Sequence, residues 1–382
     1  MPAWIDHFIV VSTAALVIVT VVPAIRAPHW AIRMWDFPRV QASVLALLIM
    51  VVSAFGIRPG AVSNQACLVL AGACLLWHLS WIWPYTRLHR REVPSAAMPA
   101  ASDTLRLMCA NVLMHNQRVP GLIATIRSYR PDIVVTLETN ERWQRELRVI
   151  HDDYPHRLAC PLENLYGMHV FAKMPLIDPK IQFLVESDIP SMHMMISPWS
   201  DGRDIHLHFL HPAPPSPTEN DESTERDAEL LVVAKAVRDC DAPLIVAGDL
   251  NDVAWSRTTR LFRKISGLMD PRIGRGMFNS FHARWPFFRF PLDHVFVSSH
   301  FSLVRMKRLP TPGSDHFAIF VELVLAGKDT AEATIEDADH SDQAEAEESI
   351  ENADVHPADV HRPGVQRTVF QSARARSLEF GT

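Results

Sequence analysis

The chain has 382 residues, of which 48% are hydrophobic and 21% are charged, and its formal net charge is −6. This length accommodates one large domain with appended segments. Residues 92–326 carry 25 Lys/Arg and 28 Asp/Glu, which excludes the strong positive balance of a generic duplex-DNA binder. The five cysteines form neither a zinc-ligand spacing nor a disulfide framework, so they suit a reducing compartment.

Three uncharged apolar stretches occupy most of residues 1–91. They are Phe8–Ile25, Val40–Ile57 and Ala61–Tyr85. Each is close to the ~20 residues that a helix needs to cross a bilayer, and tryptophans lie near their ends, as interfacial aromatics do. A cleaved signal peptide is disfavoured, because no basic segment precedes the first stretch and two more follow it. We therefore expect residues 1–91 to be a multi-pass anchor of three transmembrane helices in contact with the lipid bilayer of an inner or plasma membrane.

Arginines flank the three predicted spans unequally. Six lie on the side that also carries the rest of the chain, namely Arg26, Arg33, Arg39, Arg87, Arg90 and Arg91. Only Arg58 lies on the opposite side. Because positively charged segments tend to stay in the cytoplasm, this pattern predicts a cytoplasmic domain after the anchor.

The anchor is followed by a predicted linker at residues 92–103 and a domain at residues 104–326. Apolar runs in this domain are typical of buried strands, and several end in polar residues of catalytic type. The runs are Leu105–Asn111, Pro131–Glu138, Ile205–His211, Pro243–Asn251 and Pro291–Val297, with Asp315 and His316 ahead of Phe317–Val321. Helical spacing occurs between them at Val119–Tyr129 and at Ser223–Cys240, whose charged residues we expect to be exposed. This alternation predicts an α/β domain with a site at one edge of a sheet.

The segment Gly248-Asp249-Leu250-Asn251 is the most informative of these strand ends. An extended backbone points Asp249 and Asn251 to the same side. A carboxylate suits a hard cation such as Mg²⁺, and an amide can donate to a phosphate oxygen and accept from water. Asp315 and His316 add a second carboxylate and an imidazole. The two patches together indicate a site for a metal and a phosphate.

Residues 327–382 differ from the rest in composition. They hold 5 Lys/Arg and 13 Asp/Glu and few aromatic residues. A segment of this kind cannot bury enough apolar surface to fold by itself, so we expect a disordered acidic tail with a solvating role.

The ordered polar residues resemble those of the endonuclease/exonuclease/phosphatase superfamily, over about Leu105 to Leu325. That superfamily includes deoxyribonucleases, abasic-site endonucleases, inositol-polyphosphate phosphatases and neutral sphingomyelinases. The matching positions are Asn111, Glu138, His211, Asp249, Asn251, Asp293, Asp315 and His316. The resemblance implies a four-layer α/β sandwich, in which two packed mixed sheets are flanked by helices.

The same resemblance implies how the metal would be bound. Glu138 would be the main ligand, and Asn111 and Asp315 would complete the protein side of the site, partly through water. Mg²⁺ keeps several waters and needs few carboxylates, so this sparse oxygen set suits Mg²⁺ or Mn²⁺.

The remaining matched residues would act on the substrate. Asp249 would orient or deprotonate the attacking water, and Asn251 would hold water and phosphate together. His316 would donate to a phosphate oxygen, with Asp293 fixing its tautomer. His211 stands where deoxyribonuclease-like members carry an acid/base histidine, whereas other branches use tyrosine.

These inferences favour a membrane-anchored, divalent-metal-dependent phosphodiesterase. Its substrate would be a phosphodiester in a nucleic acid or a phospholipid headgroup. The alternative is a catalytically inactive phosphate-binding domain tethered to the membrane. A transporter is disfavoured, because the three spans contain no Asp, Glu, Lys or Arg that could form an ion pathway.

Two sets of residues bear on the choice of substrate. A nuclease needs a basic groove, for which the candidates are Arg257, Arg260, Arg263 and Lys264. A lipid hydrolase needs apolar residues at the mouth of its site, for which the candidates are Trp255, Trp285, Phe287, Phe288 and Phe290. The sequence leaves both possibilities open.

Overall fold

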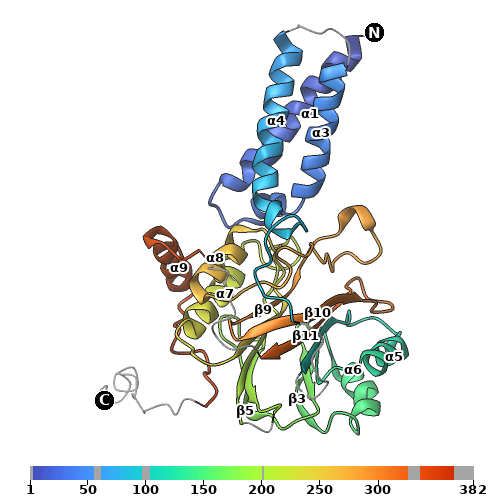
Figure 1. Cartoon of the computed structure of the whole chain (residues 1–382), viewed down its shortest axis with the longest axis vertical. Helices are drawn as coiled ribbons and strands as arrows, with labels where there is room; N and C mark the ends of the chain where they lie inside the picture. The colour runs from blue at the N-terminus through green and yellow to red at the C-terminus, as the bar shows by residue number, and fades with distance from the viewer. Residues whose placement is uncertain (1–2, 56–61, 97–103, 200–201, 326–335, 365–382) are drawn as a thin grey trace, which may run out of the picture.

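The computed structural model describes residues 3–55, 62–96, 104–199, 202–325 and 336–364. A bundle of long helices stands on one end of a sandwich of two β-sheets (Figure 1). The bundle consists of α1 (Ala3–Val21), α3 (Arg39–Phe55) and α4 (Val62–Ile82), and the short α2 (Trp30–Arg33) lies between α1 and α3.

Two stretches of the bundle are long and apolar enough to cross a membrane, His7–Ala24 and Asn64–Tyr85. A third span exists if Trp30–Asp36 and Arg39–Ala54, which meet at a bend of 66°, count as one. The bundle therefore offers two to three candidate spans where the sequence predicts three.

The connection between α1 and α3 lies against the sandwich. The Ser223 N–H donates to the Pro28 carbonyl and the Trp30 N–H to the Asp221 carbonyl, each at 2.9 Å. This connection carries Arg26 and part of the arginine-rich side of the predicted anchor. It therefore lies at the same end of the bundle as the domain that follows.

Two mixed sheets form the sandwich. One has six strands in the order β10-β11-β1-β2-β4-β3, and the other has five in the order β5-β6-β7-β8-β9. β1 is parallel to β2 and β7 is parallel to β8, whereas the other neighbours are antiparallel. The strands are β1 (Thr104–Asn111), β2 (Ile133–Leu137), β3 (His156–Cys160), β4 (Met168–Ala172), β5 (Ile177–Gln182), β6 (Ser191–Ile196), β7 (Ile205–Leu210), β8 (Leu244–Asp249), β9 (Asp293–Val297), β10 (Phe301–Leu309) and β11 (Ala318–Leu325).

The main hydrophobic core lies between the two sheets, and each sheet also buries its outer face. In β1, Leu107 and Cys109 face the central core, whereas Met108 and Ala110 face a second cluster. Because both faces are covered here, residues 107–110 form a continuous apolar run without alternation.

Helices form the two outer layers. α5 (Val119–Tyr129) and α6 (Glu141–Glu146) pack on the six-stranded sheet. α7 (Thr224–Val237) and α8 (Arg257–Ser266) pack on the five-stranded sheet. The expected four-layer α/β sandwich is confirmed.

The start of the predicted linker is part of the packed domain. Val93 is buried in the central core, and Glu92 forms an ion pair with Arg263 of α8. The Ala96 N–H donates to the Leu303 carbonyl at 3.0 Å. A linker at residues 92–96 is therefore a wrong prediction, and residues 97–103 lie outside the described residues.

The expectation of a disordered tail is wrong for residues 336–364. Helix α9 (His340–Asn352) starts with a capping box between Asp339 and Asp342. Its residues Ala346 and Ile350 are buried in the same apolar cluster as α7 and α8. Composition missed this helix because its few apolar residues fall on one face and because basic residues of α7 and α8 pair with its carboxylates. The other tail residues, 326–335 and 365–382, lie outside the described part of the chain.

The docking of α9 can be tested with Ile350→Ala. Removing this buried side chain should loosen the helix, so the amide hydrogens of residues 340–352 should exchange at least about tenfold faster. Hydrogen exchange of the full chain measures this, with the exposed Glu348→Ala as a control that leaves exchange unchanged. Equal exchange in the two variants would contradict a docked helix.

Candidate active site

The polar strand ends of both sheets meet at one end of the sandwich. The parallel strands β1 and β2 end at Asn111 and just before Glu138, and β7 and β8 end just before His211 and at Asp249. The antiparallel strand β9 begins at Asp293, which pairs with Asp249. Strand direction therefore brings residues that are far apart in sequence to the same edge.

Gly248 allows β8 to approach β7 closely just before Asp249. Its φ is +154°, and a Cβ atom there would lie 1.8 Å from the Leu210 carbonyl oxygen. No other residue fits this position without moving the backbone. Glycine therefore sets the place from which the Asp249 carboxylate projects.

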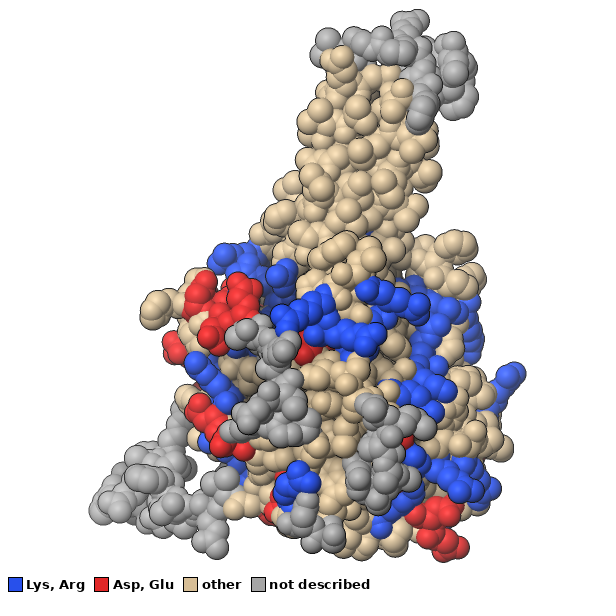
Figure 2. Space-filling view, in the orientation of Figure 1, with Lys and Arg blue, Asp and Glu red and all other residues tan. Residues whose placement is uncertain are grey.

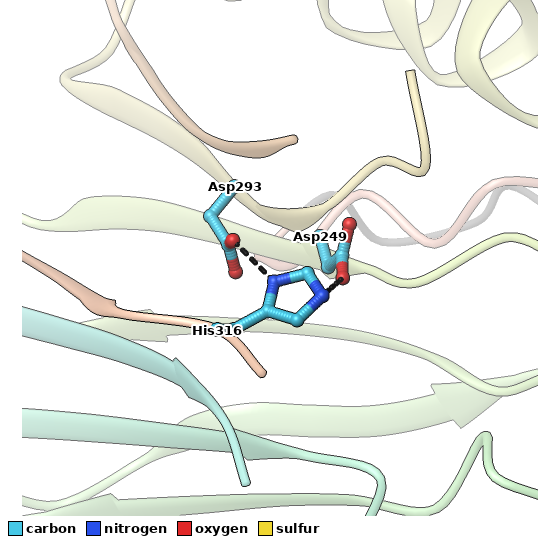
Figure 3. A group of neighbouring side chains, drawn as sticks. All are labelled: Asp249, Asp293 and His316. Carbon is cyan, nitrogen blue, oxygen red and sulfur yellow. Dashed lines mark hydrogen bonds and ion pairs between the residues drawn. The ribbon is translucent and has the colours of Figure 1, made fainter. Parts of the chain in front are cut away.

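His316 lies between two buried carboxylates (Figure 3). Its Nδ1 is 2.8 Å from Asp293 Oδ2, and its Nε2 is 3.5 Å from Asp249 Oδ2. Burial would lower the pKa of His316, but the charges of Asp293 and Asp249 outweigh burial and raise the pKa to about 10. The ring is therefore an imidazolium at neutral pH.

The two carboxylates respond differently to this cation. Burial would raise the pKa of Asp249, but the charge of His316 and the N–H donors of Asn251 and Asn111 hold it below its usual range. Burial raises the pKa of Asp293 more than His316 lowers it. Asp249 is therefore the more acidic of the two carboxylates.

Asn111 joins the two sheets through its side-chain amide. Its Nδ2 donates to Glu138 Oε1 at 2.7 Å and to Asp249 Oδ2 at 3.1 Å. Glu138 has a left-handed backbone with a φ of +59°, which is unusual for a glutamate and which functional sites often retain. These contacts place Glu138 beside the His316 cluster.

The environment of Glu138 fits a hard divalent cation. Burial first, and then the charges of Asp315 and Asp249, raise the pKa of Glu138 to about 7. Asp315 Oδ1 is buried and has no hydrogen-bond partner among the described residues. Carboxylate oxygens that lie close together repel one another, and one of them here has no hydrogen-bond partner in the described part of the chain. A divalent cation bound between them would neutralise this negative charge.

A second group of potential metal ligands lies next to Glu138 and Asp315. Asp249, Asp293 and His316 each offer an atom within 4.8 Å of the others. Because both ring nitrogens of His316 already face carboxylates, the oxygens of Glu138 and Asp315 are the atoms that could still accept a cation. The two groups are adjacent, since the charge of Asp315 acts on both Glu138 and His316.

The last two predicted residues lie next to Asp249. The Asn251 N–H donates to Asp249 Oδ1 at 3.0 Å, and Asn251 Nδ2 donates to the Pro212 carbonyl at 3.0 Å. His211 precedes Pro212, and burial lowers its pKa to about 4. His211 Nδ1 is buried without a hydrogen-bond partner among the described residues. The imidazole of His211 is therefore neutral, so it is not poised to act as an acid at neutral pH.

Some residues that support the site were not predicted. Arg226 of α7 is buried, pairs with Asp227 and Asp252, and donates to the Asn251 carbonyl at 2.9 Å. The expectation that the charged residues of this helix are exposed is wrong for Arg226 and also for Glu229. The sequence held one signal for the burial of Arg226, since Asp252 directly follows Asn251 and could have been recognised as its partner.

Three of the four candidate residues for a basic groove on α8 pair with carboxylates. Arg257 pairs with Glu345 of α9, Lys264 with Asp342, and Arg263 with Glu92. The acidic tail thus neutralises a face that the sequence presents as basic.

One of the predicted mouth residues is also misplaced. Trp255 is fully buried, and its ring packs on Tyr85 at 6.1 Å, so it belongs to the junction with the bundle. The candidates Trp285, Phe287 and Phe288 are exposed.

The charge of His316 can be measured by nitrogen NMR of the full chain labelled with ¹⁵N-histidine. With a chelator present, both ring nitrogens should remain protonated at pH 8, because Asp293 and Asp249 raise the pKa. Asp293→Asn removes one of these charges and should lower the pKa. His316→Gln identifies the signal, and a neutral ring at pH 7 in the unsubstituted protein would disprove the arrangement.

A comparison with solved structures found several that are similar to part of the chain. An endonuclease/exonuclease/phosphatase from Beutenbergia cavernae is 18% identical, with 59% of this chain and 72% of that chain covered and a TM-score of 0.48. D. rerio TDP2, solved with a single-strand DNA product, is 18% identical, with coverages of 58% and 98% and a TM-score of 0.49. The human Nocturnin catalytic domain, solved with a sulfate anion, is 14% identical, with coverages of 64% and 99% and a TM-score of 0.48.

No curated protein matches the chain. The sequence profile of the endonuclease/exonuclease/phosphatase family matches residues 108–316. This match covers more than half of the chain and runs from β1 to His316, so it includes all eight residues of the site. Family members are hydrolases that act on phosphoester bonds. The chain therefore belongs to the endonuclease/exonuclease/phosphatase family.

Proposed function

We propose that the domain at residues 104–325 is a divalent-metal-dependent phosphodiesterase that a helical anchor holds at a membrane. The observation that supports it most is the imidazolium of His316 between Asp249 and Asp293, beside Glu138. Phosphodiester hydrolysis needs an oriented water and positive charge near the phosphoryl oxygens. The site offers a group for each requirement.

Glu138 and Asp315 would hold the cation. When bound, it supplies Lewis-acid stabilisation of negative charge on the phosphate, and Mg²⁺ or Mn²⁺ suits the oxygen ligands. Asn111 has a positioning role, because its amide fixes Glu138 and Asp249 relative to each other.

Asp249 is our choice for the residue that orients and deprotonates the attacking water. Its low pKa keeps it ionised, and its position next to His316 places it near the phosphate. His316 donates its Nε2–H to a phosphoryl oxygen, while Asp293 fixes the ring through Nδ1. His211 is neutral and donates at most one N–H to the substrate.

The anchor would place this site at a membrane. Two to three of its helical stretches are long and apolar enough to span. The arginines of the connection between α1 and α3 lie at the domain end of the bundle, which favours a cytoplasmic domain under the positive-inside rule.

Substitution of either central residue should abolish most of the turnover. Asp249→Asn and His316→Ala should each lower kcat by at least about 10², because general-base and charge-stabilising groups contribute factors of this size. The exposed residues Asp239 and His340 provide matched controls, as Asp239→Asn and His340→Ala. Turnover close to that of the controls would refute the assigned roles, whereas absence of turnover in the unsubstituted protein would favour a domain that binds phosphate without hydrolysis.

Removal of divalent cations should abolish hydrolysis of a chromogenic phosphodiester. EDTA treatment followed by dialysis should leave no activity, and added Mg²⁺ or Mn²⁺ should restore it. Glu138→Gln should raise the cation concentration needed for half-maximal activity, since it removes the main ligand. Full activity after exhaustive chelation would exclude a metal-dependent mechanism.

Reporter fusions test the anchor and its orientation. A green fluorescent protein after Thr382 should fluoresce, and alkaline phosphatase at the same position should be inactive, because the first works in the cytoplasm and the second after export. Fusions truncated after Phe55 should give the opposite pair, because two of the three predicted spans precede them and the fusion point then lies on the other side of the membrane. Recovery of the full chain in the soluble fraction would show that these helices are not membrane spans.

A further inference from the structure

An exposed aromatic loop connects the site to the base of the helical bundle. Residues 281–290 form this loop, which includes a 3₁₀ turn at Pro286–Phe288. Trp285, Phe287 and Phe288 are 62%, 83% and 63% exposed. No other aromatic side chain that the structure describes outside the bundle is as exposed. Large rings exposed side by side indicate a surface that contacts an apolar partner.

The stem of the loop lies on the catalytic residues. The ring of Phe281 lies 4.9 Å from that of His316, and the Ala283 N–H donates to the Asp315 carbonyl at 2.6 Å. The Phe317 N–H in turn donates to the Ser280 carbonyl at 3.0 Å. The loop is therefore one wall of the site.

The tip of the loop lies against the first turn of α3. Gln41 Nε2 donates to the Phe287 carbonyl at 2.6 Å, and Phe290 packs edge-on to Phe37 at 5.3 Å. The loop is the orange segment beside the lower end of the bundle in Figure 1. Gln41 lies in the first turn of the candidate span Arg39–Ala54, next to its mainly apolar part. A bilayer around that span would have its surface at the level of Gln41, and hence of Phe287.

Arginines accompany these rings. Arg284 is exposed, and Arg289 and Arg308 lie against the Phe317 ring at 5.1 and 4.4 Å. No carboxylate pairs with these three arginines within the described part of the chain. Figure 2 shows Lys and Arg gathered around the base of the bundle. The three arginines donate to backbone carbonyls and leave their charges without a carboxylate partner among the described residues. Aromatic rings flanked by such arginines match the boundary between acyl chains and anionic headgroups.

We propose that residues 281–290 insert into the surface of the bilayer that holds the anchor, so that the site opens on lipid headgroups and its substrate is a phosphodiester in a membrane lipid. This inference rests on the proposed function. The net charge of residues 92–326 and the pairing of the α8 cations with α9 disfavour a nucleic acid as the substrate.

Insertion can be measured without activity in vesicles of phosphatidylcholine and phosphatidylglycerol that contain the full chain. Cys160 and Cys240 are first replaced by serine, and Phe287→Cys then carries a bimane label. The control is the same label on Phe183→Cys, an exposed aromatic position at the end of β5. Brominated lipids should quench the label at 287 and iodide the label at 183. Iodide quenching at 287 as strong as at 183, without quenching by brominated lipids, would overturn the proposal.

The substrate class is tested with Trp285→Ser, Phe287→Ser and Phe288→Ser combined. Two rates are compared, headgroup release from vesicles of phosphatidylglycerol, phosphatidylethanolamine and sphingomyelin, and hydrolysis of a water-soluble chromogenic phosphodiester. The ratio of lipid to soluble hydrolysis should fall at least about tenfold, equivalent to about 1.4 kcal/mol. Phe183→Ser should leave the ratio unchanged.

An unchanged ratio in the triple variant, or hydrolysis of single-stranded DNA in preference to every lipid, would overturn the substrate class. Hydrolysis of neither substrate by the unsubstituted protein would refute the proposed function, whereas the quenching measurement would still decide where the loop lies.

Discussion

One buried ion-pair cluster joins the two sheets where their strand ends meet. His316 precedes β11 of the six-stranded sheet, whereas Asp249 and Asp293 belong to β8 and β9 of the five-stranded sheet. A buried cation between two carboxylates is stable only while both partners stay in place, because loss of either leaves an uncompensated charge. The relative position of the sheets is therefore tied to the geometry of the site, and a shift of one sheet would separate His316 from Asp249 and Asp293.

The sequence was a good guide to local features and a poor guide to contacts between distant segments. The helix at Val119–Tyr129 has the bounds that its apolar spacing predicts, and polar residues follow the apolar runs as expected. Both depend on neighbouring residues alone. The prediction of the eight site residues rested on a family pattern, and the structure brings the eight to one edge.

The wrong predictions have a common physical cause, since each concerns a residue or segment whose partner is distant in sequence. Arg226 looks like a solvated helix residue until Asp252 is placed beside it. The α8 cations look like a binding groove until α9 covers them, and α9 looks disordered until α7 and α8 supply its apolar contacts. The composition of a segment gives its charge, but it does not show which distant residues contact that segment in the folded protein.

The contact between the bundle and the loop after Asp249 has a consequence for how the protein meets its substrate. Trp255 Nε1 donates to the Asp36 carbonyl at 2.9 Å, and the Tyr85 hydroxyl donates to the Ala254 carbonyl at 2.5 Å. An enzyme on a flexible tether samples a hemisphere around its attachment point, whereas these bonds hold the domain at one height and one tilt. Held in this way at a bilayer, the site would search by lateral diffusion in two dimensions, and its encounter rate would depend on the surface density of the substrate rather than on its bulk concentration.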